Sequence, residues 1–398
     1  MNRVLFLLLI LSTEIAIAQG TLNIYVEDIP PSHLGEDIYL SGNFNNWQPD
    51  DQSLKLIRNE KGVYQLSVAY THIPGDRIEF KFTRGTWQQS ESTADGKLTG
   101  PRIADLQKEV NLYCKIEGWR DDFPASTASE NVHVLKDSFY MPQLKDYRKI
   151  WIYLPKEYPH TQKSYPVVYM QDGQHLFDEA TSRGRIGPIE WAVDETLDQY
   201  KEPGIIVAID HHPDMEKRIP EFYYHANTAY PEPKGKAYLA FIVETLKPYV
   251  DKHYRTLRAK EYTGIAGSSL GGLISLYAAL EYPDTFGWAG IFSPSIWLDY
   301  GHIEKEIAQV TKLESIAEQH YFFYSGSNEN REKKDGSFVK MTDDINRIIA
   351  LLKKRVDPQI EHMINPYGRH GALYWREAFP VFYHGFIQGI GKKEKMKP

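Results

Sequence analysis

The chain has 398 residues, 42% of them hydrophobic and 13% aromatic, so it can bury a large core, and its length predicts about two domains. Its 46 lysines and arginines are outnumbered by 53 aspartates and glutamates, and the net charge of −7 argues against nucleic acid or an anionic membrane as a partner. The single cysteine, Cys114, excludes an intramolecular disulfide framework and a cysteine metal cluster, and we predict no metal site.

The N-terminus has the three parts of a secretory signal peptide. Met1-Asn2-Arg3 supplies the positive charge, residues 4–12 form an apolar run, and Ala16-Ile17-Ala18 offers a small-residue cleavage site. The run is too short to span a bilayer, and Glu14 interrupts its end, which disfavours the alternative of a membrane anchor. We therefore expect residues 1–18 to be removed and the mature protein to be periplasmic or secreted, with no membrane contact after cleavage.

Residues 19–117 are predicted to form a small all-β sandwich. The short alternating runs "LNIYV", "DIYLSG", "VYQLSV" and "RIEFKF" are separated by Pro, Gly, Asn and Asp, which is typical of strands joined by turns. Residues 118–130 are polar and small enough for a linker.

Residues 131–390 alternate between strand and helix patterns, and residues 391–398 are a basic, solvated tail. We expect strands at 149–155, 166–172, 204–210, 261–267, 288–293, 321–326 and 359–364, and helices at 189–200, 236–252, 270–281, 339–354 and 372–388. Nearly continuous apolar strands that alternate with helices predict an α/β domain with a mostly parallel sheet covered on both faces.

The sequence "GIAGSSLGG" fits the nucleophile pattern Gly-x-Ser-x-Gly between an expected strand and helix. A sharp turn there strains the central Ser269, and Gly267 and Gly271 let the flanking backbone approach closely. The backbone N–H of Leu270, at the start of the helix, can stabilise an oxyanion. Because Gly and Ser are common, the pattern alone also fits a plain turn before a core helix.

A serine nucleophile needs a base and an orienting acid, which follow it in the order Ser, acid, His in α/β-hydrolases. His370 lies between two glycines on the loop before the last expected helix, and we predict it as the base over His302, His320 and His362. Glu329, just past the end of a strand, is the preferred acid, with Glu332 and Asp335 as rivals on the same loop.

A second oxyanion donor is expected on the loop after an earlier strand. The sequence "VVYMQDGQHLF" places a tight Asp172-Gly173 turn there, and we favour the backbone N–H of Gln174.

Several separated blocks carry a resemblance over residues 131–390: "YMQDGQHLF", "AIDHHPDMEKR", "KAYLAFIVETLKPYVDKHYR", "GIAGSSLGGLISLYAALEYPDTFGWAGIFSPSIW" and "HGALYWREAFP". In their order they resemble the esterase family of α/β-hydrolases that includes feruloyl, acetyl and enterobactin esterases. The resemblance implies an α/β-hydrolase fold, Ser269 as nucleophile, His370 as base, Glu329 as acid and no cofactor. "SPSIW" at 293–297 resembles the pocket wall of the family.

The first domain resembles the starch- and glycogen-binding carbohydrate modules. Trp47, in "GNFNNW", Lys81, in "FKF", and Trp87 match residues of those modules, and aromatic faces beside polar groups suit sugar rings. The alternatives are that Trp47 or Trp87 is a core or interdomain residue, and that the sandwich serves only to shape a neighbouring active site.

Three functions therefore remain open. The first is an exported serine esterase that hydrolyses acetyl or feruloyl-type esters on a saccharide, a starch- or glycogen-like or a plant or algal glycan. The second is a siderophore esterase, since enterobactin esterases also carry a β domain ahead of the hydrolase. The third is a glycan-binding protein without catalytic activity.

Overall fold

The computed structural model describes residues 20–70, 77–105, 109–184, 187–226, 231–299, 301–332 and 338–396. The signal peptide predicted at residues 1–18 lies outside them. The chain divides into two compact units, the first ending at Ala125 and also including Gly187, and the second formed by the other described residues from Ser126 onward. The division at Ala125 falls inside the segment that was predicted as a linker.

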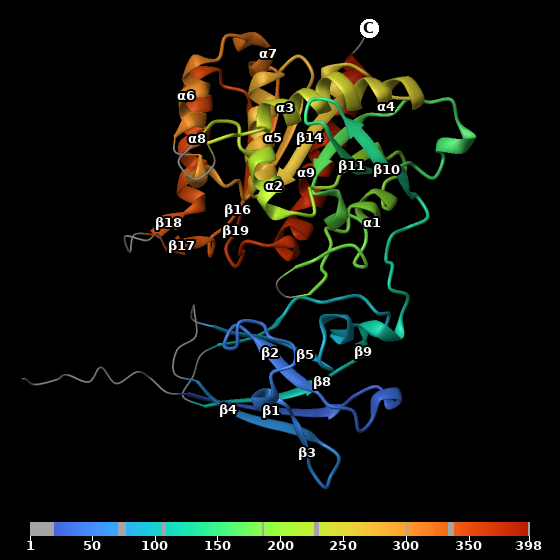
Figure 1. Ribbon diagram of the computed structural model, residues 1–398, viewed down its shortest axis with the longest axis vertical. Coiled ribbons are helices and arrows are strands. Elements are labelled where there is room, and N and C mark those ends of the chain that lie inside the picture. Colours follow the sequence, from blue (N-terminus) through green and yellow to red (C-terminus); the bar gives the residue numbers. More distant parts are fainter. Residues whose placement is uncertain are drawn as a thin grey trace, which may run out of the picture. The chain divides into compact units, whose positions relative to one another are not determined.

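The first unit consists of short strands (Figure 1). They are β1 (Gly20–Asp28), β2 (Tyr39–Gly42), β3 (Ile57–Arg58), β4 (Tyr64–Tyr70), β5 (Arg77–Thr83), β6 (Glu91–Ser92), β7 (Arg102–Asp105), β8 (Glu109–Lys115) and β9 (Gly118–Trp119). Single 3₁₀ turns are η1 (Pro31–His33), η2 (Gln52–Leu54), η3 (Trp87–Gln89) and η4 (Arg120–Asp122).

Two sheets of this unit share one hydrophobic core. Their strand orders are β3-β4-β1-β8 and β2-β5-β7, and β6 pairs with β9. Along β1 the side chains of Leu22, Ile24 and Val26 are buried and alternate with partly exposed residues, as expected for a strand with one face in a core. Phe80 and Phe82 of β5 join the same cluster from the other sheet. The unit is therefore the predicted all-β arrangement.

The second unit is built on one large sheet. Its strands are β10 (Val132–Met141), β11 (Asp146–Tyr153), β12 (Val167–Gln171), β13 (Ile205–Ile209), β14 (Thr263–Ser268), β15 (Trp288–Phe292), β16 (His320–Gly326) and β19 (Gln359–Asn365), and a separate hairpin pairs β17 (Asn330–Glu332) with β18 (Phe338–Lys340). The helices are α1 (Val193–Asp198), α2 (Met215–Phe222), α3 (Gly235–Ala240), the π-helix η7 (Phe241–Leu246), α4 (Lys247–His253), α5 (Leu270–Glu281), α6 (His302–Gln309), α7 (Leu313–Ala317), α8 (Met341–Arg355) and α9 (Ala372–Met396). The 3₁₀ turns are η5 (Tyr158–His160), η6 (Gly173–His175), η8 (Lys260–Tyr262) and η9 (Ile296–Leu298).

The order of the large sheet is β10-β11-β13-β12-β14-β15-β16-β19. Pairing is antiparallel up to the β11–β13 contact and parallel beyond it. This mixed sheet, with helices on both faces, fits an α/β-hydrolase-like fold, as the sequence predicted. Because the parallel strands run the same way, the loops after β12, β14, β15, β16 and β19 all emerge at one edge of the sheet.

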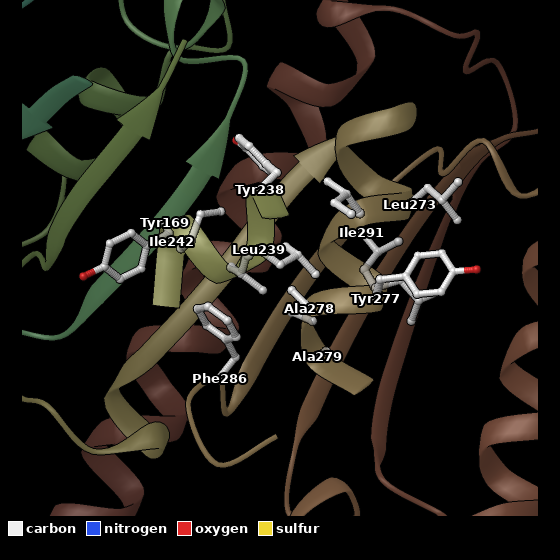
Figure 2. Packing of buried hydrophobic residues seen from close by; sticks show 14 of the residues in the cluster. Tyr169, Tyr238, Leu239, Ile242, Leu273, Tyr277, Ala278, Ala279, Phe286 and Ile291 are labelled. Atoms are coloured by element: carbon white, nitrogen blue, oxygen red, sulfur yellow. The ribbon is translucent and has the colours of Figure 1, made fainter. Parts of the chain in front are cut away.

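Each face of the sheet has its own core. Neighbouring residues of β14 point to opposite faces: Ile265 packs with Leu273 of α5, and Ala266 with Phe382 of α9. Figure 2 shows the first core, where Leu239 and Ile242 belong to the same cluster as Leu273 and Tyr277 of α5. Helix α5 is buried along nearly its whole length, which explains its continuous apolar sequence.

Several helices differ from the sequence expectation. The helix expected at 189–200 forms only over Val193–Asp198, because the backbone at Ala192 takes a left-handed conformation with φ 52°. The expected helix 236–252 is present but passes through the π-helical turn η7. Helices α2, α6 and α7 lie where no helix was expected. Among the described residues, no helix combines the length and apolar character needed to cross a membrane.

Candidate active site

Ser269 lies at the sharp turn between β14 and α5. Its backbone has φ 56° and ψ −120°, a conformation that is strained for any residue other than glycine. The Ser269 N–H donates to the carbonyl oxygen of Phe292 at 2.9 Å, which ties the strained residue to the neighbouring strand β15. A strained serine between strand and helix is the geometry that the Gly-x-Ser-x-Gly pattern predicted.

The two glycines of the pattern are required by close packing. A Cβ atom on Gly267 would lie 2.7 Å from Gln171 Cγ and 2.7 Å from the Gly271 carbonyl oxygen. A Cβ atom on Gly271 would lie 3.1 Å from Gln171 Cβ. Any larger residue at position 267 must therefore displace β12 or the first turn of α5.

The structure brings Ser269, His370 and Glu329 together in one line. His370 Nε2 lies 3.0 Å from Ser269 Oγ, and His370 Nδ1 lies 3.4 Å from Glu329 Oε2. The carboxylate accepts only, so Nδ1 carries the hydrogen of a neutral imidazole and Nε2 is left to accept the Ser269 proton. The Nδ1–Oε2 contact is longer than an ideal hydrogen bond, and such contacts often tighten only when substrate is bound.

Glu329 is the acid that contacts the histidine. It lies between β16 and β17, is 3% exposed, and its Oε1 accepts hydrogen bonds from the Gly326 N–H at 3.1 Å and the Ser293 hydroxyl at 2.7 Å. Of the rivals, Glu332 ends β17, and Asp335 lies outside the described residues.

The other candidate histidines all have contacts elsewhere. His302 stacks on His225 with ring centroids 4.6 Å apart, His320 stacks on Trp288 at 3.9 Å, and His362 Nε2 lies 3.0 Å from Ser325 Oγ.

The predicted oxyanion donors lie on neighbouring strand ends. Leu270 is the first residue of α5, where N–H groups have no acceptor within the helix, and Gln174 lies in η6, directly after β12. Because β12 pairs with β14, both N–H groups lie at the same edge of the sheet. The Gln174 side chain is itself held, since its Oε1 accepts from the His211 N–H at 3.1 Å.

Asp172, which precedes the turn that carries Gln174, has a left-handed backbone and a buried ion pair that the sequence did not reveal. Its φ is 57°, and its Oδ1 accepts from Nε and Nη2 of Arg218 at 3.0 and 2.9 Å. Arg218 comes from α2, in a segment without a clear helical pattern. The ion pair fixes the start of the turn that carries Gln174.

The predicted sugar-binding residues are only partly brought together. The rings of Trp47 and Trp87 lie 6.4 Å apart with an angle of 40° between their planes, and Trp87 is partly exposed. Trp47 is only 8% exposed. Lys81 is fully buried, and its Nζ donates to the Thr99 carbonyl oxygen at 2.9 Å, so its ammonium group lies inside the unit rather than on its surface.

A group of three acids could supply oxygen ligands to a cation. One carboxylate oxygen from each of Glu190, Asp194 and Glu195 lies within 4.8 Å of the others. Burial raises the pKa of Glu190 and of Asp194 to about 8, and Arg376 lies 3.1 Å from Glu190. Protonation of the carboxyl groups and the guanidinium of Arg376 can therefore reduce the negative charge of this cluster without a bound cation.

A family model described as "Putative esterase" matches residues 142–384. The chain belongs to this esterase family. The match takes in the Ser269, Glu329 and His370 positions, so the three residues lie within the family's own segment.

Individual relatives extend the comparison. "Uncharacterized protein YjcH" of Bacillus subtilis is 28% identical over 253 residues, which cover 63% of this chain and 95% of that protein. The enterobactin esterase FES from Shigella flexneri has a similar structure, with a TM-score of 0.55 and 16% identity, over 92% of this chain and 93% of FES. At that identity the similarity shows a shared fold. An alpha-amylase of Niallia circulans is 27% identical over 86 residues, which cover 21% of this chain and 6% of the amylase.

Proposed function

We propose that the protein is a serine esterase that works through an acyl-enzyme. The observation that carries this proposal is the contact of His370 with both Ser269 Oγ and the buried Glu329 carboxylate. Family membership supports esterase chemistry, and the geometry supports serine as its nucleophile.

Each step of the reaction uses a group of this site. Ser269 Oγ attacks the ester carbonyl carbon while His370 Nε2 takes its proton, and the N–H groups of Leu270 and Gln174 bind the oxyanion. When the tetrahedral intermediate collapses, His370 returns the proton to the leaving alcohol. Water then attacks the acyl-serine and gives a proton to His370, which returns it to Ser269 Oγ as the acid product leaves.

Hydrolysis of p-nitrophenyl acetate by wild type and Ser269→Ala tests the mechanism. We expect the variant to lose at least about 10³-fold in kcat with unchanged thermal stability. Equal rates would exclude Ser269 as nucleophile. Labelling of wild type but not of Ser269→Ala by a fluorophosphonate probe would exclude a glycan-binding protein without catalytic activity.

We further propose that the natural substrate is an acetyl or feruloyl-type ester on a saccharide. The Trp47–Trp87 pair and the short similarity to an alpha-amylase support a glycan-related first unit. We expect retention on amylose or another glycan to weaken in Trp87→Ala, which removes the more exposed ring. Tyr113→Ala is the matched control, because Tyr113 is 69% exposed on β8, which belongs to a different sheet from β2 and β5, the strands that Trp47 and Trp87 follow. Equal retention of both variants argues against this site.

A siderophore ester is the second candidate. It is favoured by the similarity to the enterobactin esterase FES, which spans 92% of this chain and so includes both units. Rates measured side by side on acetylated saccharides, feruloylated saccharides and a catecholate trilactone decide between the two. A kcat/KM at least about 1,000-fold higher for one class identifies it, because such a ratio exceeds what a single added apolar contact gives.

We also propose that the protein is exported. The N-terminal pattern of charge, apolar run and small residues supports this. Mass spectrometry of the protein from its native host should give a mature N-terminus near Gln19, and an intact Met1 or Asn2 would contradict export by this route.

A further inference from the structure

A second serine lies behind the acid of the site. Ser293 follows β15, is fully buried, and has a backbone φ of 44°, a left-handed conformation that is unusual for serine. Its N–H donates to the Tyr324 carbonyl oxygen at 2.9 Å, so the residue is tied to β16, the strand that leads to Glu329. The segment was expected from resemblance to form a pocket wall, but this serine faces the acid.

The hydroxyl of Ser293 is held between two partners. It donates to Glu329 Oε1 at 2.7 Å, and its oxygen accepts from Trp375 Nε1–H at 2.9 Å. An indole nitrogen can only donate, so the Ser293 oxygen must accept there. Its single hydrogen is therefore directed at the carboxylate, and the orientation of this hydroxyl is fixed by chemistry.

Trp375 also contacts the base. Its ring meets the His370 ring at a centroid distance of 5.0 Å and an angle of 87°, an edge-to-face contact. Trp375 thus touches the imidazole directly and reaches the acid through Ser293. With Oε1 held by Ser293 and the Gly326 N–H, the other oxygen of Glu329 is left to face His370 Nδ1.

We infer that Ser293 and Trp375 are positioning residues that aim the Glu329 carboxylate and the His370 imidazole at each other. This inference rests on the proposed serine mechanism. Neither side chain is placed at the reacting atoms. Their effect is to limit rotation of the carboxylate and tilt of the ring, so that the imidazolium formed in the transition state meets a fixed negative charge.

Two variants of Ser293 separate the effect of its hydroxyl from the effect of its strained backbone. Ser293→Ala removes the hydroxyl and keeps a Cβ atom, whereas Ser293→Gly removes the hydroxyl and relieves the positive φ. We expect both to lower kcat on p-nitrophenyl acetate by about tenfold or more while KM changes less than about twofold. If only the backbone conformation matters, Ser293→Gly will equal or exceed wild type, and the inference is wrong.

The pH dependence of kcat/KM distinguishes a positioning role from a purely structural one, because looser packing alone would not shift it. A carboxylate that is no longer aimed stabilises the imidazolium less, so the acid limb of kcat/KM in both Ser293 variants should move to lower pH. Trp375→Phe keeps a ring beside His370 but lacks the N–H, and it should show a smaller fall in kcat with KM unchanged. A fall that is equal at every pH would indicate a structural role only.

Ser325→Ala is the matched control. Ser325 is also fully buried, with hydrogen bonds to His362 and Thr342 rather than to the acid, so its loss should leave kcat within about twofold of wild type. Fluorophosphonate labelling distinguishes failure of the serine mechanism from failure of the positioning role. If wild type is neither labelled nor active, the serine mechanism and this inference are both wrong. If wild type is labelled and both Ser293 variants have the same kcat as wild type, only the positioning role is wrong.

Discussion

His370 Nε2 lies 3.0 Å from Ser269 Oγ although the two residues are 101 positions apart in the chain. The order of the sheet explains this meeting. Ser269 follows β14 and His370 follows β19, and the intervening neighbours β15 and β16 supply Ser293 and Glu329 at the same edge. A set of loops on adjacent parallel strands can therefore hold a nucleophile, a base and an acid without any of them being close in sequence.

Glu329→Gln should abolish most of the activity without unfolding the protein. The amide keeps the shape but can present its NH₂ group to His370 Nδ1, which favours the wrong tautomer, so we expect kcat to fall by about 10³-fold or more. Steady-state kinetics on a chromogenic ester checks this. Glu332→Gln, which changes the rival acid three residues further along the chain, should remain close to wild type, and the opposite ranking of the two variants would reassign the acid.

Gly267→Ala should be poorly tolerated, since its methyl group would lie 2.7 Å from both Gln171 Cγ and the Gly271 carbonyl oxygen. Forced packing of this kind typically costs about 1–3 kcal/mol, and it also displaces the turn that carries Ser269. We expect a lower melting temperature and a loss of activity. The control is Gly391→Ala in α9, where an added Cβ has no heavy atom within 4 Å and should stabilise the helix slightly.

Arg218→Met should weaken catalysis through the turn that carries Gln174, the proposed oxyanion donor. The substitution removes the guanidinium that binds Asp172 through Nε and Nη2, and it leaves a nearly buried carboxylate without its partner. A less fixed turn holds the Gln174 N–H less accurately, so we expect kcat to fall by about tenfold or more. Arg347→Met is the control: it removes ion pairs of a half-exposed guanidinium with Glu304 and Asp344 and should change neither kcat nor stability by much. Equal effects of the two variants would contradict the specific role of Asp172.

The sequence was most informative where local chemistry sets local structure. Gly267, Ser269 and Gly271 predict a strained turn because only glycine fits beside it, and His370 and Glu329 are found from chain order once that turn is known. Ser293 and Trp375 could not be found in this way, since their partners come from other strands and serine is common in turns. The helices α2, α6 and α7 were missed because short helices are stabilised mainly by packing that a single sequence does not show.

The burial of Lys81 is a further difference between what the sequence predicted and what the structure shows. Lys81 matches a sugar-contacting residue by pattern, yet its side chain lies inside the unit with its Nζ bonded to Thr99. A run such as "FKF" does not reveal on which face of the strand the lysine lies relative to a core. The pattern therefore predicted the strand correctly, while the surroundings of the lysine depend on tertiary contacts.

Asp194→Asn should stabilise the protein at high pH. Burial raises the pKa of Asp194 from its usual 3.8 to about 8, so the folded state keeps a proton that the unfolded state releases. This group does not lower the free energy of unfolding below the pKa of the unfolded state, where it is protonated in both states. The free energy of unfolding falls as the pH rises from there through the folded-state pKa. Asparagine carries no such charge and can still accept the Ser129 N–H, which lies 2.7 Å from Asp194 Oδ2.

At pH 8.5 we therefore expect Asp194→Asn to be more stable than wild type by on the order of 2 kcal/mol, which raises its melting temperature by several degrees. The difference in melting temperature should be smaller at pH 5. Thermal melts at the two pH values measure it. Asp343→Asn, at an exposed position in the first turn of α8, is the control, because the same substitution is made there at a side chain that stays in contact with water. A difference in melting temperature that is the same at both pH values would contradict this prediction, because it would mean that Asp194 is already ionised in the folded protein at pH 5.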